Sequence, residues 1–340
     1  MGEEDDLARW QNLAFGYVDP RGAPWLRTAI AGRHEQVSSD DVLCCAGAQE
    51  AVACVAGALL QPSDHAVVVL PIYQPSEQAV TGLCAATGVP LSYSDWQLDV
   101  DRVAASIRPN TKLILINFPN SPTGVGLDQQ TLLALVDVCR RYGLWLVNDE
   151  VYAQSECDLA RASVAPVVDS YERGISINGL SKGFGLPGLR VGWAVCREQA
   201  VLARALHAKS ILSSCVSSAS EILAHVALRS EPTITARTRE IGRQNRRHLH
   251  SVLAAFPDLF GRDDAQTLAF GFPRYLGPDG ADHFAARLVR DAGLMVLPST
   301  LWRSPLGSVP GNHVRIGLGH RRNAEGLDAF QQFVAVRRAA

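Results

Sequence analysis

The sequence has no long hydrophobic run and no excess of charge of either sign. Of its 340 residues, 47% are hydrophobic and 19% are charged, and the formal net charge is −2 at pH 7. The longest apolar runs, residues 51–60 and 113–116, are much shorter than the ~20 residues that span a bilayer. The N-terminus is acidic and has no apolar segment typical of a signal peptide. We therefore expect a cytoplasmic protein that binds neither membranes nor nucleic acid.

Closely spaced metal-binding motifs are also missing. The eight cysteines are scattered through apolar segments without a C-x-x-C pair, and the nine histidines form no H-E-x-x-H or comparable pattern. We expect no metal site and no disulfide framework, and we interpret the cysteines as small buried hydrophobic residues. No internal repeat is visible.

What the sequence does contain is a series of buried strands followed by a different second part. Continuous apolar, β-branched runs at residues 66–70, 111–117 and 144–149 are typical of strands covered on both faces, as in a parallel sheet. The second part has a long helical pattern over residues 217–256, broken near Glu231-Pro232, and then short strands and two further helices. This pattern and the length of the chain predict a large α/β domain followed by a smaller α+β domain.

Lys182 lies in a glycine-rich segment, residues 176–193, which is predicted to form a strand, an irregular loop and a second strand. An apolar loop can desolvate a lysine and lower its pKa, so that the free amine attacks a carbonyl. The Ser181 hydroxyl, the Arg190 guanidinium and the loop amides together suit a phosphate group. A lone Ser-Lys pair in a turn, however, is more often a solvated surface lysine.

Other polar residues stand where strands end or helices begin. Gly47 marks a strand-to-helix junction whose helix N-terminus could bind phosphate, although close packing requires glycine just as often. Asp149 ends an apolar strand and needs a partner, either a ligand cation or a salt bridge. Arg315 lies within an apolar strand, where it could bind a substrate carboxylate or an internal acid. Tyr73 follows a strand and could fill the core or stack on a ligand ring.

These stretches resemble one family. The Ser-Lys pair at residues 181–182, with Arg190 eight residues after the lysine in Gly-Leu-Pro-Gly-Leu-Arg-Val-Gly-Trp, is similar to the lysine loop of pyridoxal-phosphate enzymes of fold type I, in the class I/II aminotransferase group. The resemblance covers about residues 15–335. It implies an αβα large domain of three layers with a mostly parallel seven-stranded sheet and a smaller C-terminal α+β domain. The implied division is an N-terminal segment, 1–34, a cofactor-binding domain, 35–225, and a small domain, 226–340.

The resemblance also assigns roles. Lys182 forms a Schiff base with pyridoxal 5'-phosphate and then acts as the base, Asp149 binds the ring nitrogen, and Arg315 binds the substrate carboxylate. The remaining cofactor contacts come from Tyr73, which stacks on the ring, Tyr152, which bonds the ring hydroxyl, and the phosphate-binding group of Ala48, Gln49, Ser181 and Arg190. Tyr17 resembles the tyrosine that reaches the phosphate of the other subunit, which implies a homodimer with shared active sites.

The chain departs from the family pattern in three places. The asparagine that precedes the proline of the family's Asn-Pro-Thr-Gly turn is Ser121 here, and Asn120 comes one residue earlier. Either residue could contact the ring hydroxyl. Gly179 stands where many relatives have a hydroxyl residue. Only 16 residues precede Tyr17, so we expect either that the substrate is enclosed differently or that the start of the chain is misassigned.

The implied reaction is transfer of an amino group from an L-amino acid to a 2-oxo acid, in amino-acid metabolism or biosynthesis. The same constellation serves carbon–sulfur β-lyases and cyclising enzymes of specialised metabolism, because the protein decides the fate of the common carbanion. A regulatory dimer that binds the cofactor without turnover is a third hypothesis, which the presence of Lys182, Asp149, Arg190 and Arg315 disfavours. The sequence does not indicate which amino acid is used.

Overall fold

The computed structural model describes residues 2–157 and 164–339. Its main element is a seven-stranded sheet with strand order β1-β7-β6-β5-β4-β2-β3. The strands are β1 (Val42–Cys45), β2 (His65–Leu70), β3 (Ala85–Pro90), β4 (Thr111–Ile116), β5 (Trp145–Asp149), β6 (Gly174–Gly179) and β7 (Gly192–Val195). Only β7 runs antiparallel to its neighbours, and the remaining pairs are parallel. The predicted mostly parallel seven-stranded sheet is therefore confirmed.

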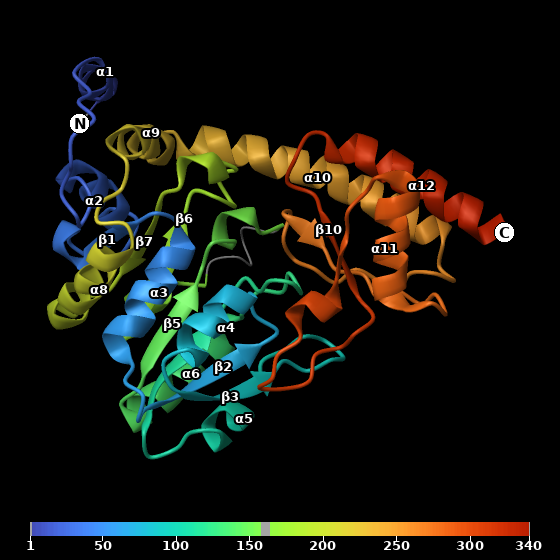
Figure 1. Ribbon diagram of the computed structural model, residues 1–340, viewed down its shortest axis with the longest axis horizontal. Helices are drawn as coiled ribbons and strands as arrows, with labels where there is room; N and C mark the ends of the chain where they lie inside the picture. The colour runs from blue at the N-terminus through green and yellow to red at the C-terminus, as the bar shows by residue number, and fades with distance from the viewer. Residues whose placement is uncertain (1, 158–163, 340) are drawn as a thin grey trace.

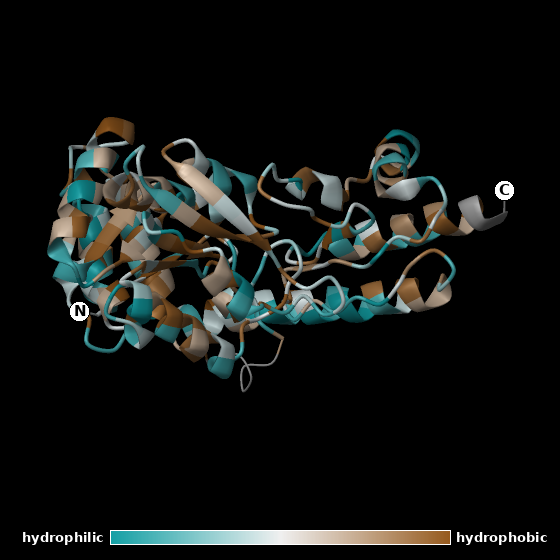
Figure 2. Ribbon diagram, turned by 90° about the horizontal axis from the view of Figure 1, so that it is seen from below, coloured by the Kyte–Doolittle hydropathy of each residue, from teal (hydrophilic) through white to brown (hydrophobic). Residues whose placement is uncertain are grey.

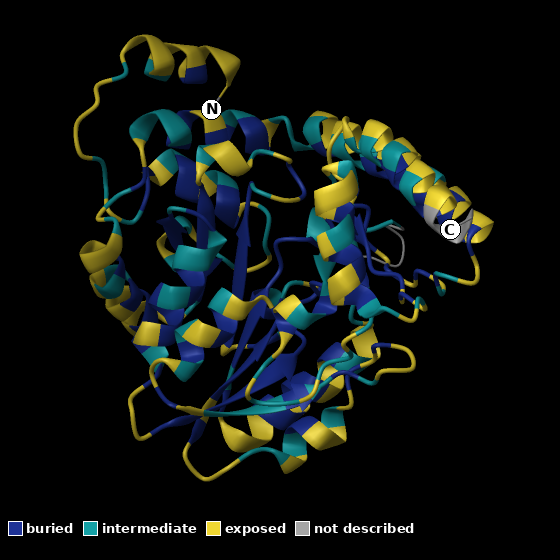
Figure 3. Cartoon of the chain, turned by 45° about the vertical axis from the view of Figure 1, so that its right-hand side comes forward, coloured by how far each residue is buried: buried dark blue, intermediate teal, exposed yellow. Residues whose placement is uncertain are grey.

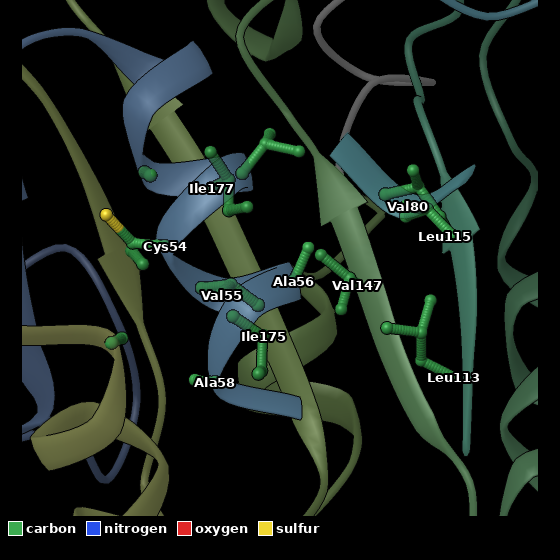
Figure 4. Close-up of a cluster of buried hydrophobic side chains, with 14 of the residues drawn as sticks. Cys54, Val55, Ala56, Ala58, Val80, Leu113, Leu115, Val147, Ile175 and Ile177 are labelled. Carbon is green, nitrogen blue, oxygen red and sulfur yellow. The ribbon is translucent and has the colours of Figure 1, made fainter. Parts of the chain in front are cut away.

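Helices cover both faces of this sheet and form three layers (Figure 1). One apolar core joins α3 (Ala48–Leu59), α4 (Gln74–Thr81) and α8 (Gln199–Leu212) to side chains such as Val68 and Leu115 (Figure 4). The opposite core joins α5 (Val100–Ala105) and α6 (Gln129–Tyr142) to Val67 and Ile114. Successive strand residues point to opposite faces, so continuous apolar runs fill both cores. Figure 2 shows hydrophobic residues concentrated in the strands, and Figure 3 shows the strands buried between partly exposed helices.

A second, three-stranded antiparallel sheet lies in the C-terminal part of the chain, with strand order β8-β10-β9. Its strands are β8 (Phe270–Gly271), β9 (Leu297–Pro298) and β10 (Val314–Gly317), and its helices are α11 (Gly280–Ala292) and α12 (Asn323–Ala339). They share an aromatic core around Phe284. This confirms the smaller α+β unit, whereas the boundaries at residues 34 and 225 stay a prediction.

Two consecutive helices connect the sheets. They are α9 (Ser218–Arg229) and α10 (Glu231–Ala255), and the break between them falls at Ser230, where the sequence predicts it. Helix α10 extends from α9 to the second sheet, where it lies beside α12 (Figure 1). At the other end of the chain, α1 (Glu3–Gln11) and α2 (Pro24–Ala31) lie against α9. The short α7 (Val167–Ser170) packs on β6.

The edge strand β3 was not predicted. Its sequence, Ala-Ala-Thr-Gly-Val-Pro, holds a single apolar β-branched residue, Val89, and it becomes a strand by pairing along β2. Gly88 allows this strand to approach Leu70 and Leu306 closely, because a Cβ there would lie 2.6 Å from Leu70 Cδ1. Over residues 2–157 and 164–339, no helix is long and apolar enough to cross a bilayer.

Candidate active site

The polar residues singled out in the sequence gather where β5 and β6 end and where α3 begins. The side chain of Tyr152, which follows β5, contacts both Lys182 and Arg315: the Lys182 Nζ lies 5.6 Å from the centre of its ring, and Arg315 Nη2 donates a hydrogen bond to its hydroxyl at 2.9 Å. Tyr152 and Lys182 follow strands of the large sheet, whereas Arg315 lies in a strand of the small sheet. Tyr152 and Arg315 are 163 positions apart in the sequence. The fold thus unites the lysine loop with the arginine strand.

The lysine loop leaves β6 through a tight turn. Gly185, with φ of +66°, donates its N–H to the Lys182 carbonyl, and Gly183 lies so close to Gln154 that a Cβ would be 2.4 Å from the Gln154 Cβ. The Lys182 side chain itself is exposed in the single chain. The burial that the surrounding apolar sequence predicts is therefore not observed, because the loop lies at the surface of the protomer.

Asp149 is the last residue of β5 and is buried. Burial raises its pKa to about 6, while a hydrogen bond from the Val151 N–H and the positive charge of Lys182 act in the opposite direction. Among the described residues no lysine or arginine forms an ion pair with Asp149, so the salt-bridge alternative is not supported. A buried carboxylate that forms no ion pair with the described residues suits a protonated ring nitrogen of a ligand.

The start of α3 forms an anion-binding cradle. Gly47, with φ of +100°, precedes the helix, whose first-turn amides have no intrahelical acceptor. Arg190 lies beside it, bonding the Ala46 carbonyl and the Ser181 hydroxyl, and forms no ion pair within the part of the chain that the structure describes. A Cβ on Gly47 would lie 2.4 Å from Arg190 Nη2, and one on Gly192 would lie 2.3 Å from the Ala48 nitrogen. Both glycines thus keep the cradle open, which fits a phosphate group.

Arg315 occupies the middle of β10 with its guanidinium between aromatic rings. Its Cζ lies 4.0 Å from the centre of Phe270 and 5.9 Å from that of Trp302. Its Nε is buried without a hydrogen-bond partner, and no acid pairs with it in the described ranges. The internal salt bridge that the sequence left open is therefore not observed. Phe270 and Trp302 were missed in the sequence, since nothing local marks aromatic residues that pack on a distant arginine.

In the Asn-Ser-Pro-Thr-Gly turn, the hydrogen bonds of Asn120 and Ser121 differ, and this difference bears on which of the two could bind a ligand. The Asn120 amide is fully used: its Nδ2 donates to the Pro71 and Asn117 carbonyls, and its Oδ1 accepts two hydrogen bonds from Thr123. Within the described residues, the Ser121 hydroxyl makes no hydrogen bond. The turn therefore leaves Ser121 as the polar group available to a ligand.

Asn117 is a further residue of the site that the sequence did not identify. It is buried, its Nδ2 donates to the Asp149 carbonyl at 2.7 Å, and its Oδ1 accepts from the Ser121 N–H at 3.0 Å. Asn117 thereby ties the turn to the end of β5. Its position after an apolar strand was visible in the sequence, but its partners were not.

Three predicted residues lie at the edge of this group. Tyr73 caps α4 and is half exposed, and Gln49 in the first turn of α3 accepts a hydrogen bond from the Ser76 hydroxyl at 3.1 Å. Tyr17 is 94% exposed, so in the single chain it does not join the site.

Together these groups match the parts of pyridoxal phosphate: a cradle for the phosphate, a buried carboxylate for the ring nitrogen and an amine for the aldehyde. An unpaired arginine remains for a substrate carboxylate. Among the described residues, no group of three or more His, Cys, Asp or Glu side chains is arranged so that it could hold a metal ion.

Comparison with known proteins agrees with a site for pyridoxal phosphate. Residues 3–325 match the family model described as aminotransferase class I and II. The chain is 32% identical over 314 residues to arginine–pyruvate transaminase AruH of Pseudomonas aeruginosa, covering 89% of this chain and 77% of that protein. It is 30% identical over 299 residues to a probable N-succinyldiaminopimelate aminotransferase, DapC, of Mycobacterium tuberculosis, covering 84% and 74% respectively.

Solved structures share the fold. A PLP-dependent aminotransferase from Streptococcus suis superposes with a TM-score of 0.88 at 24% identity, over 98% of this chain and 87% of that one. The N-succinyldiaminopimelate aminotransferase from Mycobacterium tuberculosis superposes with a TM-score of 0.84 at 27% identity, over 96% and 87%.

Proposed function

The chain belongs to the class I and II aminotransferase family, which uses pyridoxal 5'-phosphate, and on this premise we propose that it moves an amino group between an L-amino acid and a 2-oxo acid at Lys182, Asp149 and Arg315. The observation that carries this proposal is the contact series Lys182, Tyr152, Arg315. It brings an amine next to an arginine whose Nε has no hydrogen-bond partner and that forms no ion pair among the described residues.

Each cofactor contact is assigned to a residue of the site. Lys182 would hold the cofactor covalently, Asp149 would hold a proton on the ring nitrogen, and Ser121 and Tyr152 would bond the ring oxygen. Tyr73 would cover the ring face. The phosphate would be bound by the cradle of Ala48, Gln49, Ser181 and Arg190. When bound, the cofactor supplies an electron-withdrawing ring that stabilises negative charge at the substrate α-carbon.

The protein's own residues then orient the substrate and move its proton. Arg315 presents a planar fork to the α-carboxylate, and the ring of Phe270 at 4.0 Å holds that fork in one plane. Once the substrate's amino group has displaced it from the cofactor, the freed Lys182 amine, on its flexible four-carbon chain, would accept the α-proton and could donate it again. Tyr152 lies beside both groups, with its ring near the Lys182 amine and its hydroxyl bonded to Arg315, and so places the base near the carboxylate-binding arginine.

We further propose a homodimer in which Tyr17 of each subunit reaches the phosphate of the other. The support is its location on a segment whose aromatic side chains are exposed: Tyr17 is 94% and Phe15 86% exposed. Large exposed aromatic residues on one segment are typical of an interaction surface. A cytoplasmic location is proposed because all eight cysteines are free thiols.

The test is to mix the cofactor-loaded protein with single amino acids and cysteine S-conjugates, without a 2-oxo acid, while following absorbance and released ammonia. L-arginine is included, with pyruvate as the later acceptor, because AruH is named for that pair. We expect conversion that stops after one turnover and resumes when pyruvate is added. Lys182→Ala should abolish it. Continuous ammonia release would instead establish elimination, and unchanged absorbance with every amino acid would establish a binding protein without turnover.

A further inference from the structure

Helix α10 contacts both the segment that carries Lys182 and the segment that carries Arg315. It is 25 residues long and extends from the large sheet to the small one (Figure 1). Two of its side chains donate hydrogen bonds to main-chain carbonyls near the lysine, and one, Asn245, donates to two carbonyls near the arginine. Such contacts hold the backbone itself rather than a mobile side chain.

At the lysine end, Thr238 Oγ1 donates to the Gly183 carbonyl at 2.8 Å, directly after Lys182. The same hydroxyl lies 3.0 Å from the Thr235 carbonyl of its own helix, so its hydrogen is shared between the two. Arg239 Nε donates to the Gln154 carbonyl at 3.0 Å, and Gln154 packs against Gly183. The lysine loop is therefore bound to the helix directly and through its neighbour.

At the arginine end, Asn245 is buried and its Nδ2 donates to the Leu318 carbonyl at 2.8 Å and to the His320 carbonyl at 3.0 Å. Leu318 directly follows β10, three residues after Arg315. This single amide thus fixes the end of the arginine strand against the helix.

Between these two contacts, Gly242 lets the helix touch the strand segment that leads to Phe270. A Cβ on Gly242 would lie 2.5 Å from the Leu268 carbonyl oxygen. Glycine inside a helix weakens it relative to alanine, so its presence in the middle of α10 calls for such a close approach. Phe270, two residues beyond Leu268, is the ring that packs on Arg315.

Thr238, Gly242 and Asn245 stand at positions i, i+4 and i+7 and therefore share one face of the helix. At 1.5 Å per residue, the outer two are roughly 10 Å apart along the axis. We propose that α10 is a strut that sets the separation of Lys182 from Arg315, with Thr238, Gly242 and Asn245 as its positioning residues. This inference rests on the proposed function, because it assumes that these two groups act on one substrate.

The test uses substitutions at four positions of the same helix. Thr238→Val removes the hydroxyl and keeps the shape, and Thr238→Ser keeps the hydroxyl. Thr235→Val is the matched control, since among the described residues the Thr235 hydroxyl bonds only the Glu231 carbonyl, within α10 itself. Gly242→Ala inserts the methyl group against Leu268, and Asn245→Ala removes the contact at the arginine end. The cofactor-loaded proteins are mixed with an amino acid that converts the wild type in the preceding test, L-arginine first, and the maximum rate and the half-saturating concentration of the single-turnover reaction are measured.

We expect changes at the lysine end of α10 to affect the maximum rate and changes at the arginine end to affect the half-saturating concentration. Thr238→Val should lower the maximum rate about tenfold with little change in half-saturation, and Thr238→Ser should restore it. Asn245→Ala should raise the half-saturating concentration about tenfold, and Gly242→Ala should affect both quantities. The dissociation constant for pyridoxal phosphate, measured on the cofactor-free protein, should rise for Thr238→Val and stay unchanged for Thr235→Val.

Two outcomes would contradict the proposal that α10 sets the separation of Lys182 from Arg315. One is a Thr238→Val protein that matches Thr235→Val in rate and cofactor affinity. The other is a Thr238→Ser protein as slow as Thr238→Val, which would show that shape rather than the hydrogen bond matters. A Lys182→Ala protein that still reacts would instead refute the proposed function, whatever the α10 variants do.

Discussion

Two adjacent carboxyl groups at the end of β5 have different surroundings. Asp149 faces Lys182, whereas Glu150 accepts hydrogen bonds from the Ser176 hydroxyl at 2.8 Å and from the Val167 N–H at 3.0 Å. Burial raises the pKa of Asp149 to about 6 and that of Glu150 to about 7. The sequence analysis treats Glu150 as structural, and these contacts agree with that interpretation.

Glu150→Gln should flatten the dependence of stability on pH. A carboxyl whose pKa is higher in the folded than in the unfolded protein stabilises folding below its unfolded value, here 4.5, and this contribution is lost as pH rises through about 7. Glutamine is neutral throughout and can still accept both hydrogen bonds. Between pH 5 and 8 the cofactor-free wild type should lose about 2 kcal/mol more unfolding free energy than the variant.

Urea unfolding of both proteins at the two pH values measures this difference. The other buried carboxyls titrate alike in wild type and variant, so the comparison isolates Glu150. Parallel pH curves would show that Glu150 ionises normally in the folded protein.

At the scale of elements, side chains continue the pairing of β4 and β5 after the ladder ends at Ile116 and Asn148. Asn148 Oδ1 accepts from the Phe118 N–H, and Asn117 Nδ2 donates to the Asp149 carbonyl. The prolines of the adjoining turn have no N–H with which to extend a ladder. Two asparagine side chains take over that role and hold the turn beside Asp149.

Helix α3 allows a prediction with a control inside the same helix. Gly47→Ala should weaken pyridoxal phosphate binding at least tenfold and lower the unfolding free energy by about 1 kcal/mol or more, because φ is +100° and the new Cβ would meet Arg190. Gly57→Ala should leave cofactor binding unchanged and stabilise the protein by up to about 1 kcal/mol. Its Cβ would lie 3.8 Å from that of Ala208, an ordinary contact.

Fluorescence titration with the cofactor and thermal unfolding measure both effects. Equal cofactor affinity in the two variants would show that the start of α3 does not bind the phosphate.

On the scale of the whole molecule, the N-terminal segment is fixed at one end and exposed at the other. The buried Asp6 of α1 contacts His225 Nδ1 at 2.7 Å and Arg229 at 3.5 Å on α9. Beyond α1, Phe15 and Tyr17 are exposed. The body of the protomer thus presents these rings outward from an anchored helix, as a contact with a second copy requires.

Hybrid dimers test whether the sites are shared. In a dimer of one Lys182→Ala and one Tyr17→Ala subunit, shared sites place both defects in one site and leave the other intact. A statistical mixture should therefore regain about one-quarter of wild-type activity at a cofactor concentration where both parents are nearly inactive.

Lys182→Ala combined with Arg190→Ala is the control, since both residues serve the same subunit's site and their hybrid has no intact site. Recovery in neither mixture would mean that each subunit uses its own Tyr17 or none.

The sequence alone determined the architecture and the family, and it singled out Lys182, Asp149, Arg190 and Arg315 as candidate site residues. Hydrophobic periodicity is local, so buried strands and the break before Pro232 are readable, and the lysine loop is one contiguous motif. Tertiary structure alone decided the exposure of Lys182, the full use of Asn120 within its turn and the aromatic rings around Arg315. The close approach of α10 to Leu268, which explains the glycine at position 242, is also visible only in the tertiary structure. These features depend on groups far apart in the chain approaching to within a few ångströms, and no local pattern encodes which groups will meet.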